Sequence, residues 1–168
     1  NKGAHTRIIS VRDLVKLCSR LQTLFSKNHI FKPDQLIESH VYDDMFSEAA
    51  DCFTAAISAP RALNPLVNSI GESLEISKSR IELYLKKHVP KFEDHEETIE
   101  IGRSILPKAR ISLQKKSANT TSFATTNHSL RLMEQISVSI QMDEPVLLVG
   151  ETGTGKTTVV QQLGKLLH

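Results

Sequence analysis

The stretch "LLVGETGTGKTTVVQQL", from Leu147 to Leu163, lies close to the end of this 168-residue sequence. Residues 150 to 157 read GETGTGKT and match the pattern G-x-x-x-x-G-K-[ST] without a mismatch. This pattern forms a phosphate-binding loop when it follows a buried strand and opens a helix. The apolar run 145–149 is typical of a central parallel strand, and apolar residues after the loop recur at helical spacing. The sequence therefore predicts a strand, a phosphate-binding loop and a helix.

The residue types in the loop suit the chemistry of phosphate binding. Gly150, Gly153 and Gly155 allow tight bends that turn successive N–H groups inward, and the helix N-terminus adds partial positive charge. Lys156 is expected to reach the β- and γ-phosphates of ATP, and the Thr157 hydroxyl to ligate Mg²⁺. We predict ATP and Mg²⁺ as cofactors. The predicted nucleotide-binding residues are Gly150, Glu151, Thr152, Gly153, Thr154, Gly155, Lys156, Thr157 and Thr158. The alternative, a glycine-rich surface turn, does not explain the flanking strand and helix patterns.

The acidic residues that ATP hydrolysis needs are not found at the expected place. A hydrolase holds Mg²⁺ and the attacking water with a carboxylate at the end of a second strand. Asp143 and Glu144 precede the loop, and Gln141 interrupts the apolar run before them, which favours a polar turn. The histidines have no zinc-like spacing. We therefore assign no catalytic residue and expect this chain by itself to lack useful ATPase activity.

Residues 1–90 are predicted to be helical and to pack through apolar side chains. Ser10 and Asp13 have capping-box spacing at the start of a helix over about 11 to 26. Pro33 is well placed to open a second helix. Its apolar face would comprise Leu36, Ile37, Val41, Met45, Ala49, Phe53, Ala56 and Ile57. Pro60 and Pro65 interrupt the chain around a short helical piece that ends near Gly71, and a helix over 77–89, stopped by Pro90, completes this part.

The pattern changes after Pro90. "KFEDHEET" (91–98) is polar and acidic and predicts a linker or surface loop, whereas "TIEIGRSIL" (98–106) suits a short strand. Residues 129–141 again have a helical pattern. The predicted fold class is mainly α followed by partial α/β. Its parts are a helical domain (1–90), a linker with a short strand (91–122) and the beginning of a nucleotide-binding core (123–168), truncated after the phosphate loop.

Composition and charge limit the function classes. The chain is 39% apolar and 24% charged, as is typical of a soluble globular protein. A net charge of +2 gives no reason to expect a nucleic-acid or membrane partner. No apolar run approaches the roughly 20 residues of a membrane span, and no signal peptide is evident. Cys18 and Cys52 lie in helical patterns, which favours two buried thiols in a reducing compartment over a disulfide.

The order of parts resembles AAA+ ATPases, in which each module is an α/β nucleotide-binding core followed by a small helical lid. A cut across two tandem modules would leave a lid followed by a new phosphate loop. "SVRDLVKLCSRL" (10–21), "DCFTAAI" (51–57) and "EPVLLVGETGTGKTT" (144–158) are similar to the MoxR and dynein-related branch. The resemblance covers nearly the whole chain. It implies the helical lid of one module joined to the first strand, P-loop and helix of the next.

The resemblance also implies functions that the spacing of residues does not. Arg12 matches the sensor-2 position of the family, with an ordinary surface arginine as the alternative; Arg12 and Lys156 would then serve two different nucleotides. The parent protein would be a nuclear ATP hydrolase, in nucleolus and nucleoplasm, that removes assembly factors from pre-60S ribosomal particles. Other AAA+ modules of the same chain would be its intramolecular partners. A MoxR-type chaperone ATPase, a dynein-like motor segment and a non-catalytic interaction module remain open.

Overall fold

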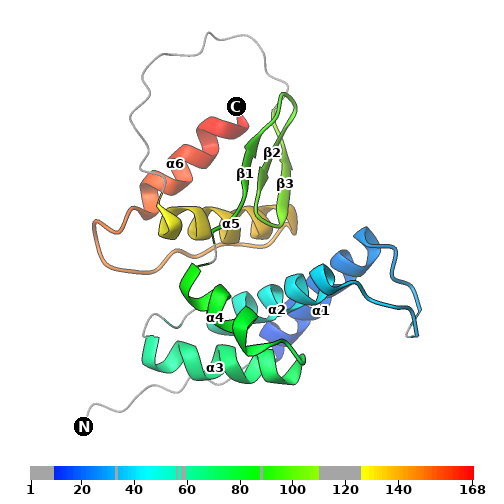
Figure 1. The fold of residues 1–168 in the computed structure, drawn as a ribbon. Coiled ribbons are helices and arrows are strands. Elements are labelled where there is room, and N and C mark those ends of the chain that lie inside the picture. The colour runs from blue at the N-terminus through cyan, green and yellow to red at the C-terminus, as the bar shows by residue number, and fades with distance from the viewer. Residues whose placement is uncertain (1–9, 33, 56, 58–59, 88, 110–125) are drawn as a thin grey trace. The chain divides into compact units, whose positions relative to one another are not determined.

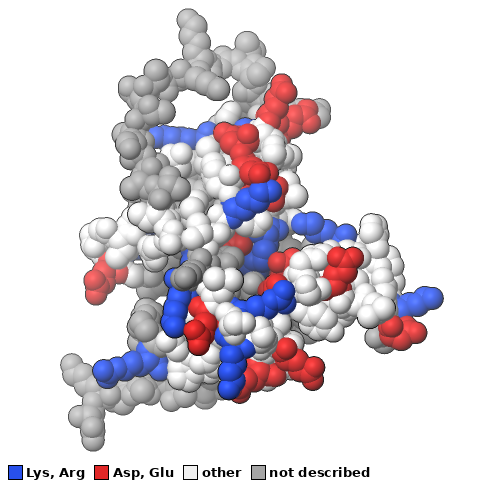
Figure 2. Space-filling model, viewed as in Figure 1, with Lys and Arg blue, Asp and Glu red and all other residues white. Residues whose placement is uncertain are grey.

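A computed structural model describes residues 10–32, 34–55, 57, 60–87, 89–109 and 126–168 of the chain (Figure 1). Two compact units are present, Asn1–Lys87 and His88–His168. Within the described residues, the first unit is helical and the second combines a three-stranded sheet with two helices. None of the described helices has the length and apolar character that a membrane crossing requires. On the face in Figure 2, basic and acidic side chains of the described residues are interspersed, in keeping with the small net charge.

The helical unit consists of α1 (Val11–Lys27), α2 (Ser39–Thr54), α3 (Pro60–Ser73) and α4 (Lys78–Lys87). Each helix packs against the next one along the chain. The core of this unit is formed by Phe46, Val67, Ile76 and Ile81, and the Phe46 ring meets the edge of Tyr84 with 5.0 Å between ring centroids. The prediction of a helical first part is confirmed.

Helix α1 begins as predicted but packs differently. The Asp13 N–H donates to Ser10 Oγ (3.3 Å) and the Ser10 N–H donates to the Asp13 carboxylate (3.0 Å), so the capping box is confirmed. The residues that α1 buries are Asp13 and Arg20, whereas Val11 and Val15 are 76% and 63% exposed. The expectation that α1 packs through its apolar side chains is therefore met only in part: Leu21, Leu24 and Phe25 are half-buried, but the apolar side chains nearer the start of the helix are exposed.

The two cysteines also differ from expectation. Cys52 is buried in α2, but Cys18 lies on the exposed side of α1, and neither forms a disulfide. The prediction of two buried thiols is therefore wrong for Cys18. Val11, Leu14 and Val15, which share a side of α1 with Cys18 by helical spacing, are exposed as well, so this apolar stripe of α1 is not covered by the described residues of the unit.

Helix α2 is shorter than the apolar pattern suggested. It begins at Ser39, and Leu36 is 94% exposed; Pro33 and Ala56 lie outside the described residues. The Gln35 amide donates to the His29 carbonyl (2.9 Å) and accepts from the Phe31 N–H (3.0 Å). These bonds hold the segment before α2 as a loop. In α3, Pro65 lies inside the helix instead of interrupting it.

The second unit contains an antiparallel sheet that the sequence only partly predicted. Its strands β1 (Phe92–Asp94), β2 (Thr98–Ile101) and β3 (Ser104–Pro107) follow one another in the sheet. Segment 91–98, expected to be a linker or loop, thus contains β1, and the single expected strand is a β2–β3 hairpin. Segment 110–122 of the expected linker lies outside the described residues.

Strand β1 escaped prediction because its pairing places two acids opposite each other. Glu93 of β1 faces Glu100 of β2, an arrangement that destabilises a sheet unless a cation lies between the carboxylates. Lys91 Nζ lies 3.0 Å from Glu93 and 3.9 Å from Glu100. The hydrogen bond to Glu93, followed by the charges of Glu100 and Glu93, raises the pKa of Lys91. The strand register brings Lys91 next to both carboxylates, where its positive charge reduces their repulsion. The sequence pattern alone does not show that Lys91 has this role.

Helices α5 (Asn127–Gln141) and α6 (Lys156–Leu167) pack against this sheet. A second capping box, between Thr126 and Ser129, starts α5 two residues before the predicted position. The core between sheet and helices comprises Ile99, Ile101, Leu106, Met133, Ile136, Val159 and Leu163. Because α6 is held by Val159 and Leu163, its N-terminus has a fixed position relative to the sheet.

Candidate nucleotide-binding site

The glycine-rich loop reaches α6 through two residues in the left-handed region. Gly153 has φ +85° and Gly155 has φ +80°, and Gly155 is the N-cap of α6. Apart from the glycine itself and its two chain neighbours, none of the described residues has an atom within 4 Å of the position that a Cβ would take at either glycine. Backbone conformation, and not crowding, therefore requires glycine at these two positions.

The first turn of α6 is suited to an anion. The earliest N–H groups of a helix have no acceptor within the helix, and they carry partial positive charge. The first turn of α6 contains no acidic residue, and no side chain caps it. Gly150 to Thr154 are exposed to solvent, as are Thr157 and Thr158. A phosphate group can therefore approach the helix N-terminus from solvent.

Lys156, the first residue of α6, folds back over the loop. Its Nζ donates to the Gly150 carbonyl at 3.0 Å, to the Glu151 carbonyl at 2.5 Å and to Thr154 Oγ1 at 3.0 Å. The Thr154 hydroxyl in turn donates to the Glu151 carbonyl at 2.9 Å. The ammonium thus lies against the residues that were predicted to contact phosphate.

The structure does not form the strand that was predicted before the loop. Residues 145–149 have no strand conformation, and Leu147 and Val149 are 87% and 83% exposed. Leu148 alone of this run packs against the core. A central parallel strand needs hydrogen-bonding neighbours on both sides, and the described strands β1 to β3 pair only with one another. The apolar run predicted burial but could not say which segment supplies the neighbouring strands.

The loop offers several groups that suit the phosphates of ATP but few ligands for a metal ion. The exposed helix N-terminus and the Lys156 ammonium match the charge of a polyphosphate. For Mg²⁺ this chain offers the Thr157 hydroxyl as one oxygen ligand. Asp143 and Glu144 form the polar turn that was predicted, with their N–H groups bonded to the carbonyls of Ile140 and Ser139. We assign neither of them to a metal.

Arg12 belongs to the other unit. It lies in the first turn of α1, next to the capping box, and is exposed to solvent. No loop residue from Gly150 to Thr158 belongs to that unit. The assignment of Arg12 as a sensor-2 residue therefore stays a prediction.

A cluster of possible metal ligands lies on the sheet, away from any sequence motif. Ligand atoms of Glu93, His95 and Glu100 lie within 4.8 Å of one another. Lys91 already contacts both carboxylates of this cluster, and its ammonium supplies the positive charge that a metal ion would bring. We therefore assign no metal to it.

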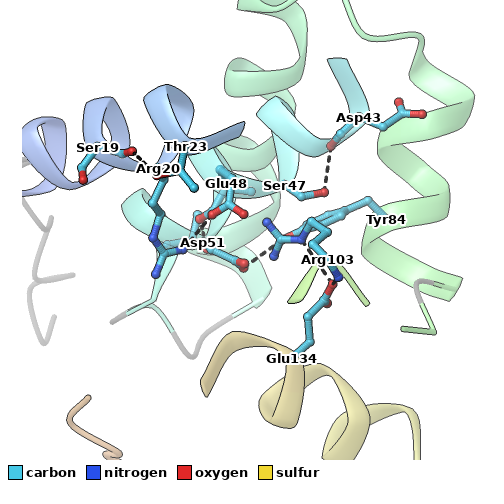
Figure 3. Close-up of polar contacts among 12 residues, drawn as sticks. Ser19, Arg20, Thr23, Asp43, Ser47, Glu48, Asp51, Tyr84, Arg103 and Glu134 are labelled. Carbon is cyan, nitrogen blue, oxygen red and sulfur yellow. Dashed lines mark hydrogen bonds and ion pairs between the residues drawn. The ribbon is translucent and has the colours of Figure 1, made fainter. Parts of the chain in front are cut away.

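Sequence reasoning missed the contact that fixes the β2–β3 turn to α5. Glu134, 3% exposed, accepts hydrogen bonds from the Arg103 N–H (3.1 Å) and from Arg103 Nε (3.2 Å) (Figure 3). Gly102 has φ +57°, and a Cβ there would lie 2.0 Å from Glu134 Oε1. The sequence held one indication of this contact, because Glu134 is a charged residue between the apolar positions Met133 and Ile136. It did not indicate the partner.

Comparison with known proteins identifies relatives of both units. Residues 1–77 match the sequence model of the midasin AAA lid domain, and residues 111–168 match that of the P-loop containing dynein motor region. A midasin from Dictyostelium discoideum is 36% identical over 184 residues, which cover 97% of this chain and 3% of that protein. A midasin from Giardia intestinalis is 57% identical over 47 residues, covering 26% of this chain and 1% of that protein. No solved structure matches the chain. The chain spans only a small part of the length of these relatives.

Proposed function

Because this chain belongs to the midasin family of AAA+ proteins, we propose that it joins the helical lid of one AAA+ module to an ATP-binding loop of the next. The observation that carries the proposal is the loop from Gly150 to Thr157, with Lys156 at the exposed N-terminus of α6. In this proposal the N–H groups of the loop bind the β-phosphate, Lys156 reaches the β- and γ-phosphates, and Thr157 ligates Mg²⁺. Hydrolysis is assigned to the parent protein, because the sequence of this chain offers no carboxylate at the place that positions water.

The surface of α1 supports an association with other AAA+ modules of the same polypeptide. Val11, Leu14 and Val15 are 76%, 48% and 63% exposed, and all three belong to the apolar stripe of α1. An apolar groove continues from this helix into the following loop, lined in part by Leu21, Phe25 and Phe31. Contiguous apolar surface of this kind is typical of an interface. We propose that the stripe packs against a neighbouring module and that Arg12, beside it, contacts the nucleotide of the module to which this lid belongs, as its match to the sensor-2 position implies.

We further propose that the parent protein acts in the nucleus as a remodelling motor on pre-60S ribosomal particles and removes their assembly factors. The support is the similarity to midasins over both units, together with the role that the family resemblance implies. The match of residues 1–77 to the midasin AAA lid domain favours this role over a MoxR-type chaperone ATPase or a dynein-like motor, either of which would also have a phosphate loop. A non-catalytic interaction module would keep the fold and lose nucleotide binding.

Nucleotide binding is tested by Lys156→Ala in the full-length protein. Hydrogen exchange of the peptide covering 147–163 is followed during titration with ADP or a non-hydrolysable ATP analogue, so that this site is measured separately from other modules. We expect the nucleotide concentration at which half of the change in hydrogen exchange occurs to rise by at least about tenfold in Lys156→Ala. The reason is that a charged hydrogen bond to phosphate contributes about 1.5–3 kcal/mol. Lys165→Ala removes the same charge from the far end of α6 and serves as the matched control. Arg12→Ala should leave this midpoint unchanged, since its proposed nucleotide is a different one.

The cellular role is tested with the same variant. Cells that depend on the Lys156→Ala protein should accumulate pre-60S particles that still carry assembly factors, and mature large subunits should decrease. The particles are separated by gradient sedimentation, and their protein content is measured by mass spectrometry in nuclear extracts. A normal particle profile in cells whose Lys156→Ala protein no longer binds nucleotide would contradict the ribosomal role while leaving the binding assignment intact.

A further inference from the structure

All three N–H donors of the Lys156 ammonium have an acceptor within the loop. A lysine ammonium has three N–H donors and no acceptor. Lys156 Nζ has three acceptors within the loop: the carbonyls of Gly150 and Glu151 and the hydroxyl of Thr154. A phosphate oxygen that approaches Lys156 must therefore displace at least one of these acceptors.

Thr154 supplies the one side-chain acceptor among the three acceptors of Lys156, and its hydroxyl is oriented to accept that hydrogen bond. The single hydrogen of the hydroxyl is used in the bond to the Glu151 carbonyl at 2.9 Å. The oxygen therefore presents lone pairs to Lys156 Nζ at 3.0 Å. Thr154 lies between Gly153 and Gly155, whose positive φ angles turn the backbone sharply on both sides of it. The two carbonyl acceptors belong to the backbone and are present whatever the side chains.

We propose that Thr154 is a positioning residue that holds Lys156 in the empty loop, so that the loop and the nucleotide phosphates compete for the same ammonium. The proposal rests on the nucleotide binding proposed above and names a residue that regulates it. On binding, the N–H that pointed to Thr154 Oγ1 turns to a phosphate oxygen. The hydroxyl keeps its bond to the Glu151 carbonyl. Thr154 thus stabilises the empty state and lowers the affinity for nucleotide.

The test compares Thr154→Val with Thr154→Ser in the full-length protein. Valine has nearly the shape of threonine and lacks the acceptor, whereas serine keeps the hydroxyl. In the titration of peptide 147–163 with ADP, Thr154→Val should lower the nucleotide concentration at half-maximal change by about two- to tenfold. This is the range for an ordinary hydrogen bond, and the larger range for a charged group does not apply because Thr154 is exposed and water replaces part of the bond. Thr154→Ser, which keeps the acceptor, should show at most a small part of this fall. A Thr154→Val midpoint equal to or above the wild-type value, or the same shift in both variants, would overturn the proposal.

A measurement without nucleotide separates this proposal from the function on which it rests. Brief acetylation with acetic anhydride is quantified by mass spectrometry at Lys156, with Lys165 of the same helix as internal reference. Thr154→Val should raise the relative labelling of Lys156 by at least about twofold, and Thr154→Ser should leave it unchanged. Unchanged labelling in Thr154→Val refutes the contact. If the wild-type loop never responds to ADP or ATP analogue, the binding function fails, and the labelling still decides whether Thr154 holds Lys156.

Discussion

Replacing Glu134 by alanine is expected to destabilise the second unit by about 3–5 kcal/mol, the range for removing one partner of a buried ion pair. The Glu134 and Arg103 side chains are 3% and 11% exposed, so the guanidinium would remain largely buried without this carboxylate. The Arg103 N–H would lose its acceptor as well. We expect the loss to appear in urea unfolding, monitored by hydrogen exchange of peptides from β2, β3 and α5.

Two further variants make this prediction specific. Glu134→Gln keeps an oxygen that can accept from Arg103 but removes the charge. The free energy of unfolding of its second unit should therefore lie between the values for the wild type and for Glu134→Ala. Glu82→Ala breaks an exposed ion pair between Glu82 and Lys86 in α4 of the first unit, where the two side chains are 67% and 70% exposed. It should change the free energy of unfolding of that unit, followed by hydrogen exchange of α4, by less than about 0.5 kcal/mol. If Glu134→Ala were as mild as Glu82→Ala, the anchor between the hairpin and α5 would have no energetic importance.

Replacing Arg20 by alanine is expected to release α1 from α2. Arg20 Nη1 donates to Glu48 Oε2 at 2.8 Å, and these side chains are 4% and 9% exposed (Figure 3). The variant leaves Glu48 buried without this guanidinium, at a cost of about 3–5 kcal/mol. Since α1 exposes much of its apolar stripe, little apolar burial within the unit compensates for the loss. Hydrogen exchange should increase throughout α1, while the core around Phe46 and Ile81 stays protected.

A paired substitution distinguishes the ion pair from simple packing. The double variant Arg20→Met with Glu48→Leu removes both charges and keeps apolar volume at the contact, so it should be nearly as stable as the wild type. Equal loss of α1 protection in the double variant and in Arg20→Ala would show that the stem of Arg20, and not its charge, holds α1. Protection of α1 that survives Arg20→Ala would contradict the prediction altogether.

What the sequence determined by itself is local. The capping box between Ser10 and Asp13, the glycines at positions 153 and 155, and the lysine that opens α6 are each set by residues a few positions apart. Hydrogen bonds and backbone angles over such distances follow directly from residue type and spacing. For that reason residue type and spacing were sufficient to predict the helices of the first unit and the phosphate loop.

Tertiary structure decided everything that depends on a distant partner. The Glu93–Glu100 pairing of β1 with β2, the Glu134–Arg103 anchor and the Arg20–Glu48 pair join residues 7, 31 and 28 positions apart. A charged residue in an apolar pattern signals a buried partner but does not identify it, because many residues of opposite charge are available along the chain. The apolar runs of α1 and of 145–149 show the same dependence. Their apolar composition predicts that other parts of the protein will cover them. Only the arrangement of neighbouring segments decides which parts do so.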